Sequence, residues 1–533
     1  MPFNYNDTSS SKFTSAGMFL ILVVCFAFFI LQGCATLPKD YEKPESYALP
    51  DTSETWLGLT AANLRANNTD ESGILLLSEG VDAMAARVYL ARKAQKSIDA
   101  QYYMLHGDTV GQIFVSELIK ASQRGVRVRL LIDDIDTIGR DLDATKLDML
   151  PNFELRIFNP FIRDRGRGGQ VITGFGDITR RMHNKAFVVD NEFAVVGGRN
   201  IGNEYFGAES PVSFLDLDGL LIGPVVKEIS VEFDTYWNNP VVYPINAISK
   251  EKPTNEDLVQ TLQEFDELLR AQRYTNFLAR VDESEIAQAI NSGDIRFEWG
   301  QARVLYDSPD KIINTRDKAQ YHLRTQIRPE FGGVTEELIL VSPYFVPGSD
   351  GVKIMASLVK KGVRVRVLTN SLASTDVRIV HAGYSRYRKN LLRAGVELYE
   401  LKPSSGIDED KEDKETFDSE KTSLHAKTFI LDRKSIFVGS MNLDSRSAFE
   451  NTEIGILFES EVLARQAAER LDSELLQMAY RLEIYTDKSG NDRILWNSIE
   501  NGQDVVFTTD PETSFWQRLG YGILGMLPIE SEL

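Results

Sequence analysis

The chain has 533 residues, of which 43% are hydrophobic and 26% charged, a composition typical of globular domains with sizeable cores. Its 59 basic against 78 acidic residues give a net charge of −19, which argues against a general nucleic-acid binder because phosphate contacts need a basic surface. Two cysteines exclude a disulfide framework, and five histidines leave little room for a His/Cys zinc cage.

The amino terminus has the features of a targeting segment. Residues 18–31 form an apolar run of 14 residues, which is signal-peptide length and short for a membrane span. The run leads into Gly33-Cys34, and this arrangement resembles a bacterial lipoprotein signal, in which residues 1–33 are removed and Cys34 is lipidated. An uncleaved signal anchor is the alternative. Both interpretations place the chain at a membrane of a bacterial envelope, facing the periplasm or the cell exterior, and leave inner and outer membrane undecided.

The rest of the chain divides into two domains and their connections. Residues 34–70 are polar, contain three prolines and predict a tether. Residues 71–241 and 296–485 each predict an α/β domain, and residues 242–295 predict a helical connector because leucine and phenylalanine recur there at helical spacing. Residues 486–533 form a carboxy-terminal tail whose apolar part suits either a bilayer surface or packing against its own domain.

The two domains are copies of one module. The sequence GVRVRLL at 125–131 returns as GVRVRVL at 362–368, and each copy follows a helical stretch and a strand-like run ending in Tyr103 or Tyr344. Strand, helix and strand in this order predict a parallel βαβ unit. The tyrosines lie 241 residues apart and the GVRVR sequences 237 apart, so the duplication includes small insertions.

A second repeated motif carries chemistry. MHNKAFVVD at 182–190 is echoed by LHAKTFILD at 424–432, and the β-rich runs that follow end in GGRN at 197–200 and GSMN at 439–442. Side chains at i and i+2 of a strand share a face, so the histidine and lysine of each copy point the same way. The small residues let backbone approach a ligand, and the asparagine adds an amide donor.

Two such sets facing each other form a site for phosphoryl chemistry. They surround a phosphoryl group with donors and place one histidine on each side, as in-line displacement needs a nucleophile, an acid for the leaving group and charge stabilisation. One His-x-Lys pair alone is an ordinary exposed polar pair, whereas the same long spacing twice in a chain with five histidines predicts a shared site. The candidate residues are His183, Lys185, Asp190 and Asn200 in the first copy and His425, Lys427, Asp432 and Asn442 in the second.

These motifs resemble the paired HxKxxxxD signatures of the phospholipase D superfamily, over about residues 73–481. The stretches 180–185, 196–202 and 375–403 further resemble bacterial cardiolipin synthases, especially the C-type. The resemblance implies an α/β fold of two tandem phospholipase D-like domains. Each has a mixed β-sheet flanked by helices, and a pseudo-two-fold relates the domains, with the active site between them.

The resemblance also implies a phosphatidyl transfer in two steps, without metal or cofactor. By analogy, His183 attacks phosphorus to form a phosphatidyl-histidine, and His425 protonates the leaving alcohol and then deprotonates the incoming one. Lys185, Lys427 and the two asparagines hold the phosphoryl oxygens. The sequence itself does not decide which histidine is the nucleophile.

Members of the superfamily place an acid behind each histidine, which fixes its tautomer. Glu453 fits this position in the second copy. In the first copy, laying Phe214 over Phe449 matches Asp218 to Glu453, whereas the distance from the histidine and the family pattern favour Asp216. We prefer Asp216 and keep Asp218 as the alternative.

The expected protein is a membrane-anchored cardiolipin synthase that acts on phosphatidylglycerol and phosphatidylethanolamine and binds no nucleic acid. A phospholipase D hydrolase that releases phosphatidic acid is the alternative with the same chemistry. A nuclease of the superfamily is disfavoured by the net charge of −19 and the membrane signal. A catalytically silent, lipid-binding envelope lipoprotein is disfavoured because the motifs are intact in both halves.

Overall fold

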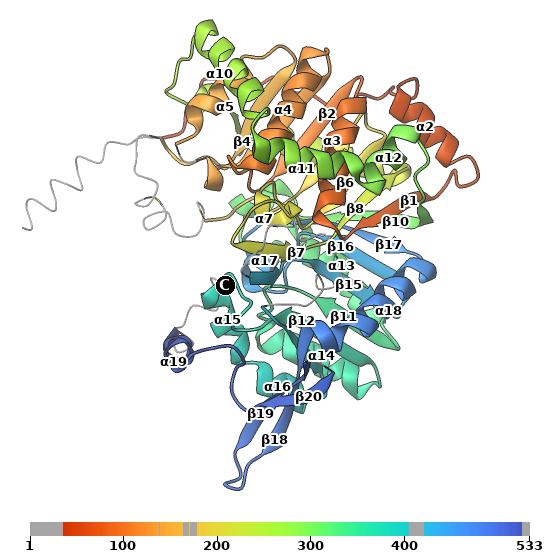
Figure 1. Ribbon diagram of the computed structural model, residues 1–533, viewed down its shortest axis with the longest axis vertical. Coiled ribbons are helices and arrows are strands. Elements are labelled where there is room, and N and C mark those ends of the chain that lie inside the picture. The colour runs from red at the N-terminus through yellow and green to blue at the C-terminus, as the bar shows by residue number, and fades with distance from the viewer. Residues whose placement is uncertain are drawn as a thin grey trace, which may run out of the picture.

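The computed structural model describes residues 36–137, 139–163, 170, 179–403, 421–500 and 502–524 (Figure 1). The predicted signal segment and Cys34 lie outside the described residues. Within those residues, every helix is too short or too polar to span a bilayer.

Each half contains a mixed sheet with the same order of strands. In the first half the hydrogen-bonded order is β1 (Ser72–Leu77), β8 (Asp218–Ile222), β6 (Phe193–Gly197), β5 (Ala186–Val189), β2 (Ser97–Tyr102), β3 (Arg127–Asp133), β4 (Phe153–Phe158) and β9 (Val242–Pro244). In the second half it is β10 (Glu298–Tyr306), β17 (Ile454–Glu459), β16 (Ser435–Gly439), β15 (Lys427–Leu431), β11 (Glu337–Val341), β12 (Arg364–Asn370), β13 (Glu397–Leu401) and β18 (Ala479–Thr486). β2, β3 and β4 pair in parallel, as do β11, β12 and β13, and the other pairs are antiparallel. The predicted duplication and the mixed α/β class are therefore confirmed.

The predicted βαβ units are present in both halves. The repeated GVRVR sequences enter β3 and β12, each reached through a helix, α4 (Thr109–Gln123) or α14 (Gly348–Lys360). Each helix ends beside a glycine with positive φ, Gly125 at 93° or Gly362 at 92°, a conformation that favours glycine at a helix end. β2 is buried along its length, as expected for a strand covered on both faces.

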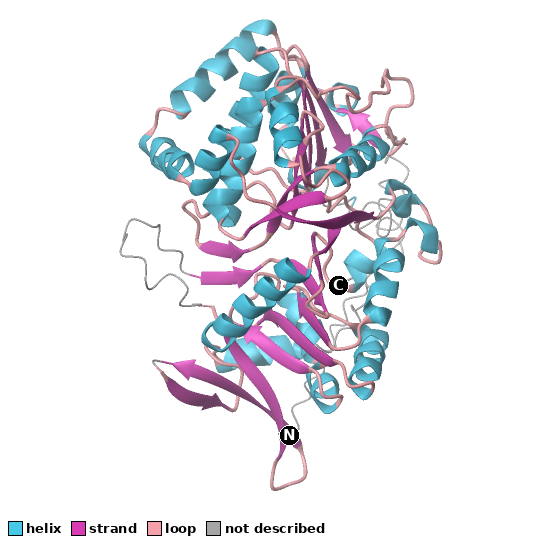
Figure 2. Ribbon diagram, turned by 90° about the vertical axis from the view of Figure 1, so that its right-hand side faces the viewer, coloured by secondary structure: helices cyan, strands magenta, loops and turns pink. Residues whose placement is uncertain are grey.

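The two sheets share a hydrophobic core, because successive side chains along a strand point to opposite faces of its sheet. In β5, Phe187 and Val189 pack outward with α3 (Gly80–Lys93) and α4, whereas Ala186 and Val188 face the second half. The shared core includes Ile436 of β16 and the buried face of α8 (Pro224–Trp237). β1 and β10 also pair antiparallel, so one sheet continues from half to half. Figure 2 shows the strands of both halves between flanking helices.

Further elements connect the two halves and cover their outer faces. A short parallel pair, β7 (Val212–Leu215) and β14 (Lys421–Leu424), crosses between the halves. The other helices are α2 (Trp56–Leu64), α5 (Asp141–Asp148), α7 (Asn203–Phe206), α9 (Ile245–Ile248), α13 (Leu323–Gly333), α15 (Arg378–Ser385), α16 (Arg388–Arg393), α17 (Ser445–Phe449) and α18 (Glu461–Met478), with 3-10 turns η1 (Asp134–Asp136), η2 (Pro309–Ile313) and η3 (Ala319–Tyr321).

The segments outside the two repeats differ from simple linkers. The predicted tether packs on the first half: Lys43 Nζ donates to Asn239 O at 2.7 Å, and the Ala48 amide donates to Asp234 at 2.8 Å. The predicted helical connector contains α10 (Asn255–Leu268), α11 (Gln272–Glu283) and α12 (Glu285–Ser292), of which α11 and α12 pack against α3. The tail adds β19 (Asp492–Glu500) and β20 (Gln503–Phe507) to β18, and then α19 (Phe515–Leu524) packs against α15.

Candidate active site

Both histidines lie where one half contacts the other. His183 precedes β5 and its amide donates to Thr452 O at 2.8 Å, while His425 precedes β15 and its amide donates to Leu215 O at 2.8 Å. β7 and β14 hold the second contact in register, and an isolated bridge between Met182 and Thr452 holds the first. Each histidine is thus fixed by backbone hydrogen bonds to the opposite half.

The acid behind each histidine also comes from the opposite half. Glu453 Oε2 lies 2.8 Å from Nδ1 of His183, and Asp216 Oδ2 lies 2.6 Å from Nδ1 of His425. Both acids were expected from the sequence, but each beside the histidine of its own copy, and this pairing is wrong. The physical reason is the crossing between the halves: Thr452 and Leu215, which bind the histidine amides, directly precede the two acids.

The alternative acid, Asp218, has a different partner. Its buried carboxylate lies 3.0 Å from Arg87 and 3.4 Å from Arg199, so it neutralises guanidinium groups in the interior. The sheet register explains the distinction. Gly197, the last residue of β6, pairs with Asp218, and Gly439, the last residue of β16, pairs with Gly455. Asp218 therefore corresponds to Gly455, and Asp216 corresponds to Glu453. Laying Phe214 over Phe449 therefore misaligns the copies by two residues.

The surroundings of the histidines favour neutral imidazoles. Burial lowers the pKa of His183 to about 4, against the opposing effect of Glu453, and burial also lowers the pKa of His425. Burial alone would raise the pKa of Asp216 and Glu453, but the nearby histidine and lysine charges outweigh it and both pKa values are lowered. Each carboxylate therefore accepts the Nδ1–H of its histidine, which leaves Nε2 as the basic, nucleophilic nitrogen.

The two lysines bring positive charge into the same buried space. Lys185 Nζ donates to the His183 carbonyl, and Lys427 Nζ donates to the His425 carbonyl. Burial lowers the pKa of Lys427 to about 8 and that of Lys185 well below its ordinary value. The two lysine charges act on each other, and acids of both halves act on both lysines, so the groups form one electrostatic unit. A bound phosphoryl anion would relieve the cost of burying these ammonium groups.

The two asparagines are buried at corresponding positions. Asn200 Nδ2 donates to the Tyr205 hydroxyl at 2.8 Å. Among the described residues, neither Asn200 Oδ1 nor Asn442 Oδ1 has a hydrogen-bond partner. Both unpaired atoms are acceptors, so a hydrogen-bond donor, such as a hydroxyl group of a ligand, would complete them.

The motif aspartates have a positioning role. Asp190 accepts the backbone amides of Gln95, Lys96 and Ser97 at 2.7 to 3.2 Å. Asp432 accepts the corresponding amides of residues 335–337 at 2.7 to 3.2 Å. Both lie at the end of the strand remote from the histidine, so the expectation that they belong to the catalytic set is corrected: they fix the hairpin to the preceding strand.

Sequence reasoning missed the aromatic walls of the site. The Tyr103 ring lies 5.0 Å from the His183 ring, and the Tyr344 ring lies 6.4 Å from that of His425. The rings of Tyr205 and Phe214 each lie 5.1 Å from His425. Tyr103 and Tyr344 are repeated at the ends of equivalent strands, and this repetition could have predicted them. Tyr205 and Phe214 are not repeated in the second copy, so the sequence contains no sign of their role.

Two serines that hold Glu453 were also missed. Ser440 Oγ donates to Oε2 at 2.5 Å and Ser447 Oγ donates to Oε1 at 2.7 Å. Ser440 is the serine of the GSMN sequence, and the first copy has Gly198 at this position. The two acids therefore differ in their hydrogen-bonding environment.

The arginines ahead of the first motif engage the protein itself. Arg163 pairs with Asp134, Arg181 lies 3.2 Å from Asp133, and Arg180 lies 2.6 Å from Glu450 of the second half. Arg165 and Arg167 lie outside the described residues. The three described arginines therefore stabilise the fold, and Arg180 connects the two halves.

One group among the described residues has the side chains for a metal ion. Potential ligand atoms of His106, Asp108 and Glu204 lie within 4.8 Å of one another. Asp108 already accepts the amides of Gly111, as the cap of α4, and of Asn203. Since this carboxylate is engaged, the group is explained as a structural connection between α4 and α7.

The fold and this site are those of a tandem phospholipase D-like phosphatidyltransferase. Residues 89–237 and 329–475 match the family described as "Cardiolipin synthase, PLD-like domain". The chain is 39% identical over 471 residues to cardiolipin synthase C of Escherichia coli (strain K12), covering 88% of this chain and 97% of that protein. It is 32% identical over 509 residues to an uncharacterized protein of Helicobacter pylori (strain ATCC 700392 / 26695), covering 94% and 97%. The chain therefore belongs to the cardiolipin synthase family of phospholipase D-like proteins.

A solved structure shows the same fold. Phosphatidylserine synthase of Haemophilus influenzae Rd KW20 superposes with a TM-score of 0.53 at 15% sequence identity, covering 79% of this chain and 92% of that one. At this identity the likeness concerns the arrangement of the two sheets and their helices. It supports the tandem architecture that brings the two histidines to one interface.

Proposed function

We propose that this protein makes cardiolipin by transferring a phosphatidyl group from one glycerophospholipid to the headgroup alcohol of another, through a phosphatidyl-histidine. The observation that carries the proposal is the exchange of acids between the halves. It gives two buried histidines with basic Nε2 atoms in the field of two lysines. The similarity to cardiolipin synthase C supports the lipid substrate class.

In the first step, His183 Nε2 attacks phosphorus. The P–N bond forms, the bond to the headgroup oxygen breaks, and His425 donates a proton to that oxygen. Burial lowers the pKa of His183 to about 4 and keeps its imidazole unprotonated, as a nucleophile requires. The anionic phosphodiester and the Asp216 carboxylate together stabilise the imidazolium of His425 before transfer.

In the second step, His425 accepts the proton of the incoming headgroup hydroxyl. That oxygen attacks phosphorus, the P–N bond breaks, and His183 returns to its neutral form with Nδ1–H still bonded to Glu453. Lys185, Lys427 and the remaining Nδ2–H groups of the two asparagines donate to the non-bridging oxygens in both steps. Because they are preorganised and buried, they stabilise the developing charge without reorganisation.

The lipid partners and the location extend this proposal. Phosphatidylglycerol supplies a glycerol hydroxyl as acceptor, and phosphatidylglycerol or phosphatidylethanolamine supplies the phosphatidyl group. Either lipidated Cys34, after removal of residues 1–33, or an uncleaved anchor within residues 1–33 holds the chain in a bacterial envelope membrane, with the catalytic halves on the periplasmic or outer side. An acidic chain of net charge −19 gains little overall attraction to anionic lipid, so an anchor of this kind keeps the enzyme at its substrates.

The test is a product assay with the purified full chain in vesicles of phosphatidylglycerol and phosphatidylethanolamine. Cardiolipin as the product, lost in His183→Ala and His425→Ala, supports the proposal. Phosphatidic acid as the sole product shows that water is the acceptor and that the protein is a hydrolase. Full activity in both alanine variants refutes the histidine mechanism.

A further inference from the structure

The carboxy-terminal helix α19 exposes aromatic side chains. Phe515 is 62% exposed, Trp516 74% and Leu519 44%, although large apolar groups of this kind are usually covered. The helix is nevertheless packed on one side, where the Tyr521 ring lies 6.2 Å from the ring of His381 on α15. α19, at the lower left of the molecule in Figure 1, is therefore held in place by α15, while Phe515, Trp516 and Leu519 remain exposed.

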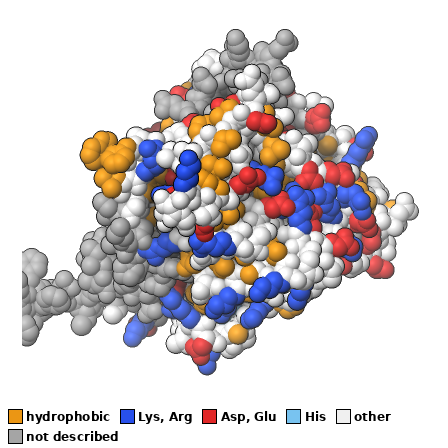
Figure 3. Space-filling model, turned by 90° about the horizontal axis from the view of Figure 1, so that it is seen from below, with side chains coloured by type: hydrophobic (Ala, Val, Ile, Leu, Met, Phe, Trp, Pro, Cys, Tyr) orange, Lys and Arg blue, Asp and Glu red, His pale blue; other side chains and the backbone are white. Residues whose placement is uncertain are grey.

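Positive charge is concentrated next to this apolar surface. Residues 377–396 contain five arginines and lysines and no acid, and α19 contains Arg518 and no acid, in a chain of net charge −19. Two of the five are neutralised within the protein, because buried Arg388 pairs with Glu400 and Arg393 pairs with Asp492. Arg378 is exposed on α15. The nearby acids have partners within the protein: Asp510 pairs with Arg388, and Glu512 accepts the Tyr480 hydroxyl. Figure 3 shows apolar side chains protruding at this edge, with Lys and Arg side chains beside them.

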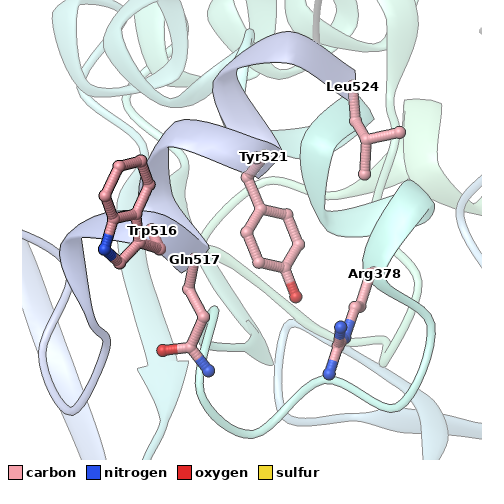
Figure 4. Close-up of a pocket in the computed structure, with 6 residues that line it drawn as sticks. Arg378, Trp516, Gln517, Tyr521 and Leu524 are labelled. Atoms are coloured by element: carbon pink, nitrogen blue, oxygen red, sulfur yellow. The ribbon is translucent and has the colours of Figure 1, made fainter.

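α19 and Arg378 of α15 line an open hollow of about 520 Å³. Its lining residues are Arg378, Trp516, Gln517, Gly520, Tyr521 and Leu524. In Figure 4, Tyr521 lies between the indole of Trp516 and Leu524, and the Arg378 guanidinium lies below Tyr521. A guanidinium beside aromatic and aliphatic groups matches the headgroup region of a bilayer, where phosphates lie next to the first carbons of the acyl chains.

This surface is connected to the active site. Asp376, two residues before Arg378, accepts the Tyr344 hydroxyl at 2.6 Å, and the Tyr344 ring lies 6.4 Å from that of His425. Lys421 Nζ donates to Thr375 O at 2.7 Å and fixes the same segment to β14. The segment that leads into α15 is therefore part of the wall beside His425.

We propose that α19 and the exposed part of α15, here called the α15–α19 face, dock the enzyme on a bilayer that contains anionic phospholipids. Phe515, Trp516 and Leu519 enter the interface, and Arg378 contacts lipid phosphate. The inference rests on the proposed function for its purpose, since docking here turns the wall beside His425 toward the source of lipid substrate. An amino-terminal anchor holds the chain at the membrane, and the α15–α19 face orients it.

Brominated lipids test the docking independently of catalysis. Of the five tryptophans, Trp237 and Trp496 are buried, whereas Trp516 is 74% exposed. With the full chain in vesicles of phosphatidylcholine and phosphatidylglycerol, bromine near the start of the acyl chains quenches wild-type fluorescence, and Trp516→Phe reduces this quenching at least threefold. In the Trp516→Phe background, Leu519→Trp restores quenching, whereas Val506→Trp, at a 54% exposed position of β20, does not. Equal quenching of wild type and Trp516→Phe overturns the proposal.

Enzyme activity on vesicles and on micelles provides a second test of the docking. For the double variant Phe515→Ser/Trp516→Ser we expect the ratio of activity on anionic vesicles to activity on lipid–detergent micelles to fall about tenfold, while the matched control Val506→Ser keeps the wild-type ratio. An unchanged ratio in the double variant overturns docking. Trp516-dependent quenching in a wild-type protein that makes no cardiolipin supports docking and refutes the proposed function.

Discussion

Each catalytic histidine is paired with an acid of the opposite half, and mutation of one acid distinguishes this arrangement from pairing within each copy. In Glu453→Gln, the residue changed belongs to the second half but the imidazole affected is His183 of the first. The Nδ1–Oε2 distance of 2.8 Å and the burial of both groups describe a charge-assisted hydrogen bond, which contributes about 1.5–3 kcal/mol. Replacing the carboxylate by an amide of similar size removes this contribution, so we expect kcat to fall about 10- to 150-fold.

Imidazole NMR identifies which histidine responds. The chain has five histidines, so selective ¹⁵N-histidine labelling gives few signals, and His183→Gln and His425→Gln assign the two of interest. Glu453→Gln should shift the His183 signals and leave those of His425 near their positions, and Asp216→Asn should do the opposite. The reverse pattern would show that each acid serves its own copy and would refute the exchange. Gln301→Glu, on an exposed part of β10, controls for a general charge effect.

Three further results are expected. Asp218→Asn leaves buried Arg87 and Arg199 without their carboxylate, so it should lower the free energy of unfolding by about 3–5 kcal/mol in chemical denaturation and leave the imidazole signals unchanged. Asp432→Asn should lower stability by about 1.5–3 kcal/mol with little change in KM, because the carboxylate accepts the backbone amides of residues 335–337 and the Thr335 hydroxyl and does not contact the histidines. The pKa of Asp432 is lowered in the folded state, so the contribution of its carboxylate to stability is complete above about pH 4 and is lost as the pH falls through the folded pKa. Asp432→Asn should therefore lose less stability than the wild type when the pH falls from about 7 to about 3. A difference in stability between the two proteins that is equal at about pH 3 and about pH 7 would contradict this account. In kcat/KM profiles, the pKa of about 8 for Lys427 predicts declining activity above pH 8, because the neutral amine no longer attracts the phosphoryl anion, and Lys427→Arg should move this decline to higher pH.

The duplication and the principal site residues were predictable from the sequence because they depend on local spacing. His-x-Lys ahead of a strand, and an asparagine after small residues, are repeated at nearly constant separation, so both the common fold and the paired sets follow. The pairing of His183 with Glu453 was not predictable in this way. In two copies related by a pseudo-two-fold, the same spacings are compatible with an acid serving its own half or the other half, and only long-range contacts such as that of His183 with Thr452 decide between them.

Other differences have the same origin. A tether was predicted over residues 34–70 because they are polar and contain three prolines. In the structure, polar atoms of residues 43–48 bind α8 and its carboxyl end, a contact between segments about 190 residues apart. The register that equates Asp216 with Glu453 depends on cross-strand pairs and not on the nearest matching phenylalanine. Tertiary pairing, in each case, adds information that local composition does not contain.

The exchange also explains why the two copies belong in one chain. Neither half alone contains a histidine with its acid, so an isolated half lacks a complete catalytic pair. Two identical chains could supply both pairs, but their environments would be equal. Fusion allows them to differ: Glu453 is held by Ser440 and Ser447, whereas Asp216 lies beside Gly198 and its histidine is surrounded by aromatic rings. Because the two steps need one nucleophile and one proton carrier, an asymmetric pair suits the reaction better than a symmetric one, and the different responses of His183 and His425 to Glu453→Gln and Asp216→Asn measure this asymmetry directly.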